Sequence, residues 1–526
     1  MKSISLLAVA STLFASALAD LNKAPLSSRQ LLQSGALQSP APALAGKGAP
    51  HGTASSEAVS KLCDDLQQKL GGKVVRLQTT LVDTAYFQSV DHAYNAEQRA
   101  YKPTCSVLAT QASHVVDTYA AVKAAGAGYG VRGGGHNPNY GWNSSPDVFI
   151  DFGQWCDVTL SDDGNTADIA PGCRWGEVYS TLEAQGKTVV GGRVSNVGMG
   201  AVLGGGLSHL TPEHGLIADN VMSYTIVLPS GELVTAGSGG DYADLWWALK
   251  GSTNQMGIVV NYKLLTKDVG EWWGGLLTFL PTQVDAFVDA VAEYNAKYDS
   301  FNDTKAAIVP TITWVDLPTP ALLLVGLAYH GPSRPKGIFD MFFDLKPVAD
   351  TTRKSSYADI NGVYDFGSLY GSSTHFRTSS SYLSKTQARE IYAAFQDFAT
   401  KNVGLWWSLS LSYESFTASG LAKAAAAGGN PQGWAAGRGF TAQTYLVQWV
   451  PSLPTHKKQR LLAAAKAATT AGSDDIPLFI NYAAADQQPL LSYGNLDRLR
   501  GIKAKYDADS YVTKHTGGPR FEGGDF

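Results

Sequence analysis

Two spacings of apolar side chains alternate along the first half of the chain. Over 56–70 and 112–125 apolar residues recur every three or four positions, which predicts helices that bury one face. Short runs rich in β-branched and aromatic residues predict strands, which fall at 106–110, 129–132, 149–152, 167–170, 188–190, 221–228 and 232–236. A further helix is predicted over 174–185. This half is therefore expected to be α+β, with its strands joined by glycine-rich turns.

Longer elements are predicted after Lys267. The pattern favours a strand over 322–329, amphipathic helices over 385–401 and 455–471, a strand over 476–482 and a helix over 496–506. Residues 405–413 alternate apolar and polar side chains, which predicts a strand with one apolar and one polar face. Residues 422–439 are small and glycine-rich, and we expect a mobile loop there. A large sheet backed by helices accounts for this half.

The N-terminus has the features of a secretion signal. Lys2 precedes an apolar run over 4–18, and Ala17-Leu18-Ala19 forms a small-residue cleavage site. Residues 20–55, rich in Ala, Pro, Ser and Gly, are expected to be a flexible lead-in. No other apolar stretch reaches the ~20 residues of a membrane span. We therefore expect a secreted, monomeric protein that does not enter the membrane.

Secretion favours disulfides, and four cysteines allow three pairings. We expect Cys63 to pair with Cys105, and Cys156 with Cys173. The chain lacks the CxxC spacing that is typical of metal sites, so its cysteines do not indicate one. Sequons at Asn143 and Asn302 are candidate glycan sites.

Charge and missing motifs exclude several classes of function. The net charge is −4 and no long basic run exists, so we expect no nucleic-acid partner. The chain contains no GxxxxGK[ST], no GxSxG and no HExxH motif, which argues against nucleotide triphosphate chemistry and common hydrolases.

Two glycine-rich segments indicate a cofactor site. In the first, the strand at 129–132 runs into Gly133-Gly134-Gly135-His136, where glycines would let backbone N–H groups approach a phosphate. The second covers 191–200 and 204–206, and its GxG lacks the third glycine of a Rossmann fingerprint. Together they suggest two walls of one long site; alternatively, the first is a glycine turn with an incidental histidine.

The mature chain resembles the berberine bridge enzyme-like branch of the vanillyl-alcohol oxidase / p-cresol methylhydroxylase superfamily of FAD enzymes. The resemblance rests on five blocks in order, at 131–136, 172–179, 198–221, 244–259 and 481–494. It implies an α+β fold with a two-part FAD-binding domain (PCMH-type) and a substrate domain with a large antiparallel sheet backed by helices. The expected divisions are 1–19 signal peptide, 20–55 lead-in, 56–268 FAD-binding domain (PCMH-type part about 101–268), 269–475 substrate domain and 476–526 returning C-terminal segment.

The resemblance also implies the residues that bind the cofactor. His136 matches the histidine that carries FAD covalently, and Tyr482 stands beside the flavin ring as the candidate catalytic base. The other matching positions are Arg132, Gly133, Gly134, Gly135 and Asn137 in the pyrophosphate loop, Val197, Gly198, Gly200, Gly204 and Gly205 in the second turn, Ile258 and Val259 near the adenosine, and Asn481 beside the ring.

One departure from the family pattern concerns the second turn. Many relatives attach FAD a second time through a cysteine, and here Val194 stands at that position. We therefore expect a single covalent link, through His136. Val197 matches a gate residue at which valine is associated with oxygen access, which favours an oxidase.

The predicted activity is that of a secreted FAD-dependent oxidase. It would remove a hydride from an alcohol-type substrate, a carbohydrate or a secondary metabolite, and reduce molecular oxygen to hydrogen peroxide. The alternatives are a flavin-dependent dehydrogenase, a secondary-metabolite cyclising oxidase and a binding-only flavoprotein. Further residues considered near the site are His209, His214, Tyr413, Glu414, Gln448 and Arg377; Trp406, Trp407, Trp434 and Trp449 are either sugar-stacking or core and lid residues.

Overall fold

The computed structural model describes residues 52–76, 84–298, 303–316, 318, 320–367 and 370–522. The predicted signal peptide, nearly all of the lead-in and Asn302 lie outside the described residues. Among the described helices, none combines the length and the apolar character that crossing a membrane requires.

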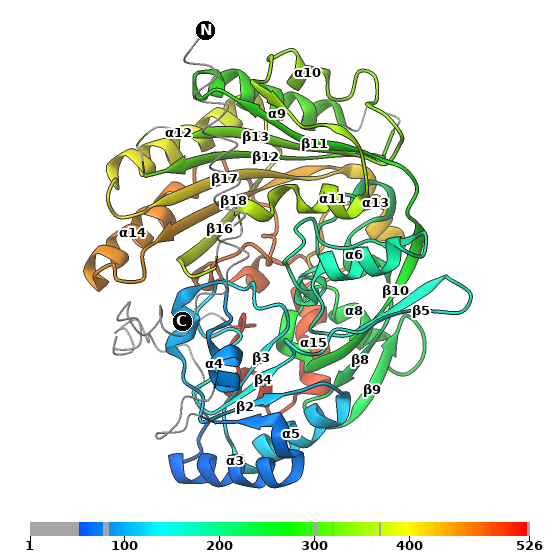
Figure 1. Cartoon of the computed structure of the whole chain (residues 1–526), viewed down its shortest axis with the longest axis vertical. Coiled ribbons are helices and arrows are strands. Elements are labelled where there is room, and N and C mark those ends of the chain that lie inside the picture. The colour runs from blue at the N-terminus through cyan, green and yellow to red at the C-terminus, as the bar shows by residue number, and fades with distance from the viewer. Residues whose placement is uncertain are drawn as a thin grey trace.

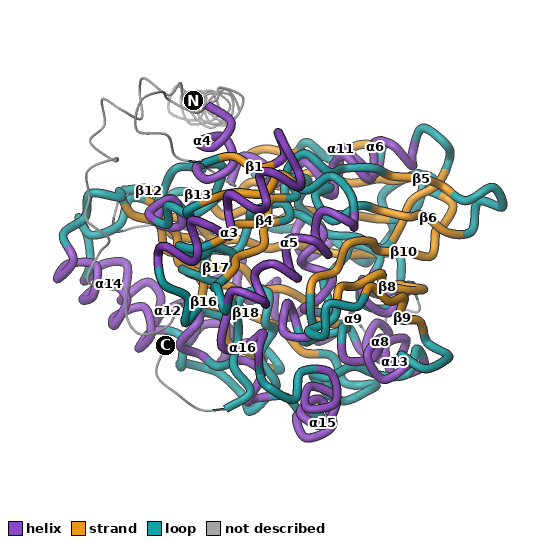
Figure 2. Tube along the Cα trace, turned by 90° about the horizontal axis from the view of Figure 1, so that it is seen from below, coloured by secondary structure: helices purple, strands orange, loops and turns teal. Residues whose placement is uncertain are grey.

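A four-stranded sheet forms the lower end of the molecule in Figure 1. Its strands, in spatial order, are β1 (Val74–Val75), β2 (Cys105–Leu108), β4 (Val148–Asp151) and β3 (Tyr129–Arg132), and β4 runs parallel to both β2 and β3. The helices α3 (Ser56–Leu70) and α5 (Ala112–Ala125) bury their apolar faces against this sheet, as the view from below shows (Figure 2). The predicted disulfide between Cys63 and Cys105 is confirmed and ties α3 to β2.

A second sheet lies beside the first. Its order is β5 (Val158–Leu160), β6 (Thr166–Ile169), β10 (Ile258–Asp268), β8 (Val221–Val227) and β9 (Leu233–Gly237), with β7 (Lys187–Val189) also paired to β10. The second predicted disulfide, Cys156–Cys173, is also confirmed and closes the segment that contains β5 and β6. The helices of this region and of the chain end are α4 (Thr84–Asp91), α6 (Trp175–Glu183), α7 (Thr211–His214), α8 (Ala243–Ala248), α15 (Leu496–Tyr506) and α16 (Tyr511–His515).

The upper part of Figure 1 is an eight-stranded antiparallel sheet. Its order is β14 (Ala349–Asp350), β11 (Trp272–Phe279), β13 (Leu322–Tyr329), β12 (Ala306–Val315), β17 (Ser408–Phe416), β18 (Phe440–Trp449) and β16 (Ser373–Ser381), with β15 (Arg353–Ser355) paired to β11. The helices α9 (Val284–Tyr298), α10 (Asp340–Phe343), α12 (Lys385–Lys401) and α14 (Thr455–Ala468) pack on its outer face. The opposite face looks toward the two smaller sheets, with α11 (Tyr357–Asn361) lying against α6. The predicted α+β architecture with a large helix-backed antiparallel sheet is confirmed.

The alternation predicted around 405–413 separates two environments. Leu409, Leu411 and Tyr413 are fully buried in the core between the sheet and its helices. Ser410 and Ser412, with opposite parity, lie on the inner face. The period of two thus decides which side chains can reach a ligand.

Two expectations for the second half are wrong. Residues 422–439 are not a loop throughout, because α13 (Ala418–Ala426) occupies their beginning; Thr417 caps this helix, its alanines favour a helical backbone, and the glycines start only at 428. Residues 476–482 form an irregular segment that ends in a turn at 480–482, rather than a strand. Their apolar side chains are buried against the aromatic cluster around Phe416 and Trp434, and no strand of the described chain pairs with them.

Candidate active site

A cavity of about 450 Å³ lies where the three sheets meet. Its walls come from the loop after β3, the turn at 192–203, the start of β10, the inner face of β12, β17 and β18, and residues 479–482. Most residues predicted from the sequence to bind the cofactor line it: Arg132, Gly133, Gly134, Gly135, His136, Asn137, Val197, Gly198, Gly200, Ile258, Val259, Asn481 and Tyr482. Gly204 and Gly205 do not line it. Gly204 lies behind Asn481, whose side chain leaves no room there for a Cβ atom.

The two glycine turns lie back to back. A Cβ atom on Gly134 would come 2.6 Å from Gly198 Cα, so glycine is required here by the contact between the turns themselves. The N–H groups of Gly133, Gly134 and Gly135 find no acceptor among the described residues. Consecutive free N–H groups are suited to binding a phosphate. Gly200 also lines the cavity, and no atom lies within 4 Å of where its Cβ atom would stand.

Arg132 has a structural partner. Its guanidinium forms an ion pair with Asp151, with Nη2 2.6 Å from Oδ2, and both side chains are 4% exposed. Nη1 donates to the carbonyl of His92 at 2.9 Å. Because Asp151 neutralises this charge, Arg132 holds the glycine turn on β3 and β4 rather than offering a free cation to a phosphate.

His136 follows the first glycine turn and faces the cavity. Its Nε2 is shielded from solvent and has no hydrogen-bond partner. The imidazole stacks on Tyr94 with ring centroids 4.0 Å apart and an angle of 14°. Desolvation, assisted by the nearby charge of Arg174, lowers the pKa of His136 to about 4. The ring is therefore neutral at physiological pH and keeps a lone pair.

The residues of this wall fit a flavin dinucleotide. The free N–H groups suit its pyrophosphate, the open space at Gly200 admits a bulky group, and the unpartnered neutral imidazole suits attachment to the flavin ring. No cysteine thiol is available among the described residues for a second attachment, since all four cysteines are in disulfides.

A buried charged triad lies at another wall of the cavity. Arg193, from the second turn, has Nη1 2.6 Å from Glu414 Oε2 on β17, and the two side chains are 8% and 7% exposed. Arg193 Nη2 also donates to the hydroxyl of Tyr482 at 2.8 Å. Arg193 therefore holds the Glu414 carboxylate and the Tyr482 hydroxyl on the two ends of one guanidinium. Glu414 is the one carboxylate on the cavity wall in the described part of the chain.

The surroundings of Tyr482 do not make its hydroxyl acidic. Desolvation raises the pKa of Tyr482, the charge of Glu414 raises it further, and Arg193 only partly offsets both. Tyr482 is therefore protonated at neutral pH. Its hydroxyl can donate a hydrogen bond or pass a proton on, and the side chain near it that carries acceptor oxygens is Glu414.

Hydroxyl groups cover the inner face of the large sheet. They belong to Thr311 and Thr313 on β12, Ser410 and Ser412 on β17, and Thr444 on β18. Thr311 and Ser412 are hydrogen-bonded to each other at 2.8 Å, whereas Thr444 Oγ1 has no partner within the described chain. This wall offers several hydrogen-bonding groups to a ligand.

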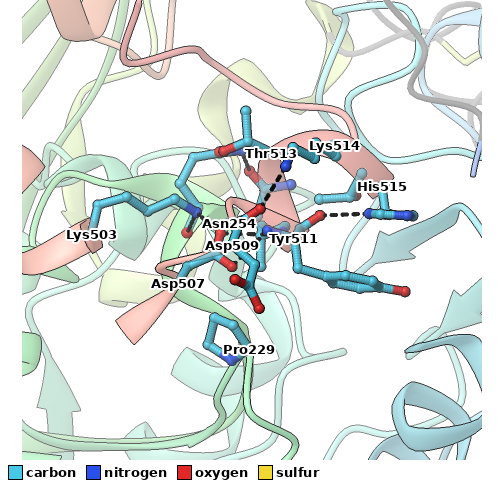
Figure 3. A network of polar contacts seen from close by, with 12 residues as sticks. Pro229, Asn254, Lys503, Asp507, Asp509, Tyr511, Thr513, Lys514 and His515 are labelled. Carbon is cyan, nitrogen blue, oxygen red and sulfur yellow. Dashed lines mark hydrogen bonds and ion pairs between the residues drawn. The ribbon is translucent and has the colours of Figure 1, made fainter. Parts of the chain in front are cut away.

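Thr516 of the C-terminal segment also lines the cavity, and a network of polar contacts holds this segment in place (Figure 3). Lys503 donates to the carbonyl of Gln255 at 2.5 Å and pairs with Asp507, whose carboxylate accepts the N–H of Tyr511. Asn254, which lines the cavity, donates to the carbonyl of Gly517 at 2.7 Å. The network fixes residues 511–517 next to the cofactor wall.

Several residues considered from the sequence lie elsewhere. His209 and His214 do not line the cavity. Tyr413 is in the core, Gln448 bonds to Thr374, and Arg377 pairs with Asp486. Of the four tryptophans, Trp406 and Trp449 are core residues, Trp434 packs on Phe416, and none lines the cavity.

The sequence patterns predict no role for Arg193 and none for Tyr94. Arg193 lies inside the second glycine-rich segment. A single cationic residue in a segment expected to line the cofactor site could have marked it as a candidate site residue. Glu414 has the same parity as Ser410 and Ser412, which would have placed it on the polar face. Nothing in the local sequence marks Tyr94, because its contact with His136 is made by the fold.

Comparisons with known proteins agree with this site. Residues 103–237 match the family described as FAD binding domain. An FAD-dependent monooxygenase of Fusarium proliferatum is 27% identical over 500 residues, covering 90% of this chain and 96% of the relative. The bifunctional solanapyrone synthase of Alternaria solani is 32% identical over 280 residues, covering 52% and 53%. The structure of a xylooligosaccharide oxidase from Myceliophthora thermophila superposes with a TM-score of 0.70 at 18% identity, covering 88% of this chain and 99% of that one. The chain therefore contains an FAD binding domain at residues 103–237, is similar to FAD-dependent oxidoreductases over most of its length, and shares its fold with the xylooligosaccharide oxidase, in agreement with the resemblance found in the sequence.

Proposed function

We propose that this protein is an oxidase that carries FAD covalently on His136 and oxidises a hydroxylated small molecule. The observation that supports this most is the position of Glu414, Arg193 and Tyr482 on the same cavity as His136 and the glycine turns. When bound, the flavin accepts a hydride from the substrate. The protein must then remove the hydroxyl proton of the substrate.

Glu414 is the proposed proton acceptor. It lines the cavity, and a carboxylate oxygen held in an ion pair keeps a further lone pair that can accept a hydrogen bond from a substrate hydroxyl. Tyr482 orients that hydroxyl by a hydrogen bond. Arg193 holds both groups and balances the charge of Glu414, which makes the buried carboxylate tolerable.

The hydroxyl-lined wall supports an alcohol substrate. Ser410, Ser412 and Thr444 offer donors and acceptors that a purely apolar ligand would leave unpaired. The xylooligosaccharide oxidase shares the fold, and its name agrees with a carbohydrate substrate. The absence of tryptophans other than Trp142 from the cavity wall, in the described chain, argues against a stacked sugar platform built from the four tryptophans considered above.

The second candidate is an oxygen-inserting or cyclising activity on a secondary metabolite. It is favoured by the relatives that cover most of the chain, which are named FAD-dependent monooxygenases, and by the solanapyrone synthase. Products made under labelled oxygen distinguish the two. An oxidase releases hydrogen peroxide and leaves the product unlabelled, whereas a monooxygenase incorporates the label.

The experiment that tests the proposal compares wild type, Tyr482→Phe and Glu414→Gln. Each is mixed anaerobically with a panel of polyols, sugars and phenolic alcohols while flavin absorbance is followed. We expect reduction by a hydroxylated substrate, slowed roughly 10²-fold or more by Glu414→Gln. Flavin content, measured in parallel, separates a lost base from a lost fold. Wild-type reduction rates in both variants would exclude the triad from catalysis.

We further propose the secretion and domain boundaries predicted from the sequence. The two disulfides suit an oxidising compartment. The chain leaves the second sheet at the end of β10 and enters the eight-stranded sheet with β11. This change of sheet near residue 268 supports a boundary between the cofactor domain and the substrate domain. Asn143 borders the cavity, so a glycan on its sequon would compete with the ligand for space. A monomer remains our expectation, which light scattering would test.

A further inference from the structure

Residues 92–98, which we call the strap, run alongside the loop that carries His136. They precede the part of the chain that matches the FAD binding domain. The strap contacts successive positions of that loop: Arg132 Nη1 donates to the carbonyl of His92, the N–H of Tyr94 donates to the carbonyl of Gly135, Asn95 Nδ2 donates to the carbonyl of Pro138, and the N–H of Gly141 donates to Gln98 Oε1. The strap therefore fixes the loop backbone on both sides of His136.

Tyr94 also fixes the imidazole ring. It is 1% exposed, and its ring lies nearly parallel to that of His136, at 4.0 Å and 14°. The ring of Phe376, from the large sheet, lies nearly parallel to Tyr94 at 6.2 Å and 13°, and Tyr370 meets its edge at 5.8 Å. Because Tyr94 is packed on several sides, it cannot follow the imidazole if that ring rotates.

We propose that Tyr94 is a positioning residue that holds the imidazole plane of His136 for covalent attachment of the flavin. This rests on the proposed covalent link. In the attachment, a bond between an imidazole nitrogen and the 8α-methyl carbon replaces one N–H and one C–H bond. The two hydrogens and two electrons leave with dioxygen as hydrogen peroxide. Bond formation needs the nitrogen lone pair aimed at one carbon, and a freely rotating ring meets this condition only part of the time.

The stacking contact accounts for this role better than general packing does. Nε2 of His136 has no hydrogen bond, so no polar contact at that atom sets the angle of the ring. The Tyr94 face is the one aromatic surface in contact with the imidazole in the described chain. Removing the ring of Tyr94 should therefore slow attachment while the pyrophosphate turn still binds FAD.

The test follows covalent incorporation in the full-length protein. Wild type, Tyr94→Phe and Tyr94→Leu are incubated with FAD in air, and at intervals the flavin that stays with acid-precipitated protein is divided by the total flavin bound before precipitation. Tyr86→Leu is the matched control, because Tyr86 is equally buried near the strap and makes no ring contact with His136.

We expect Tyr94→Leu to slow covalent incorporation roughly tenfold or more. Tyr94→Phe, which keeps the stacked ring, and Tyr86→Leu should keep the wild-type rate. Equal rates in wild type and Tyr94→Leu overturn the role of Tyr94, as does an equal loss in Tyr86→Leu. If Tyr94→Leu does not fold, Tyr94→Met, whose unbranched side chain adapts better to an irregular space and also lacks a ring, carries the same comparison. If the wild-type protein never retains flavin after acid precipitation, the covalent link itself is overturned. This outcome is distinct from equal incorporation rates in wild type and Tyr94→Leu, which overturn only the role of Tyr94.

Discussion

Gly134 and Gly198 meet backbone to backbone. A Cβ atom on Gly134 would lie 2.6 Å from Gly198 Cα, and one on Gly198 would lie 2.5 Å from Gly134 N. The two turns come from distant parts of the chain, and they touch only because both positions lack a side chain. The contact brings the free N–H groups after β3 and the turn of Arg193 and Val197 to one cavity.

Alanine at Gly198 should therefore separate the two walls. We expect Gly198→Ala to lower the free energy of unfolding by about 1–3 kcal/mol, as overpacking does, and to reduce flavin content. Gly200→Ala should unfold like wild type but bind less flavin, since its Cβ atom would enter open cavity space. Gly501→Ala, on the open surface of α15, is the control: it should leave the flavin content unchanged and should not lower the free energy of unfolding, because alanine favours a helix over glycine. Thermal unfolding and flavin absorbance of the purified variants check this. Wild-type values for Gly198→Ala would mean that the turns separate without cost.

Oxygen access should depend on Val197. This residue lines the cavity, and the N–H of Val197 bonds to the carbonyl of Val194 at 3.2 Å, which orders the turn. Val197→Ile adds one methylene and should slow reoxidation by oxygen while leaving reduction by substrate nearly unchanged. Val403→Ile adds the same group at an exposed position that does not line the cavity and serves as the control. Stopped-flow mixing of the reduced enzyme with aerated buffer measures the rate of reoxidation in wild type and in both variants. If the wild-type flavin stays reduced for minutes in air, the protein is no oxidase.

Two shielded histidines should make the fold sensitive to acid. Desolvation, with the charge of Arg193, lowers the pKa of His209 to about 3, and desolvation, with the charge of Arg377, lowers that of His375 to about 4. Between about pH 6.5 and these values the unfolded chain binds protons that the folded chain does not. Stability is therefore complete above pH 6.5 and falls on acidification, by up to about 1.4 kcal/mol per pH unit for each histidine.

Denaturant unfolding at pH 7.5 and pH 5.0 measures this loss. We expect a lower midpoint at pH 5.0 and a smaller difference in His209→Phe, which removes one titrating ring and its two unpartnered nitrogens. Identical midpoints at the two pH values in wild type would show that both rings are protonated in the folded protein.

Local patterns predicted several elements with their exact bounds. The helix at 112–125 buries one face, which imposes a period that the sequence must carry. The strands at 129–132 and 322–329 are buried on both faces and appear in the sequence as short apolar runs. The alternation on β17 even distinguished the core face of Leu409 and Leu411 from the cavity face of Ser410.

The catalytic grouping was beyond such patterns. The triad comes from three segments that are far apart in the sequence. Only the packing of the sheets brings Glu414 and Tyr482 within 3 Å of Arg193. The strand predicted over 476–482 failed for a related reason: its apolar residues are buried by aromatic side chains, not by pairing with another strand. Burial alone does not tell a strand from a buried turn.

Mass spectrometry of the purified protein tests the central claim most directly. Trypsin cleavage after Arg132 and Arg174 releases residues 133–174, which contain His136 and the Cys156–Cys173 disulfide. We expect this peptide to carry the flavin and fragmentation to place it on His136. An unmodified peptide, with all flavin recovered in the acid supernatant, would contradict the account.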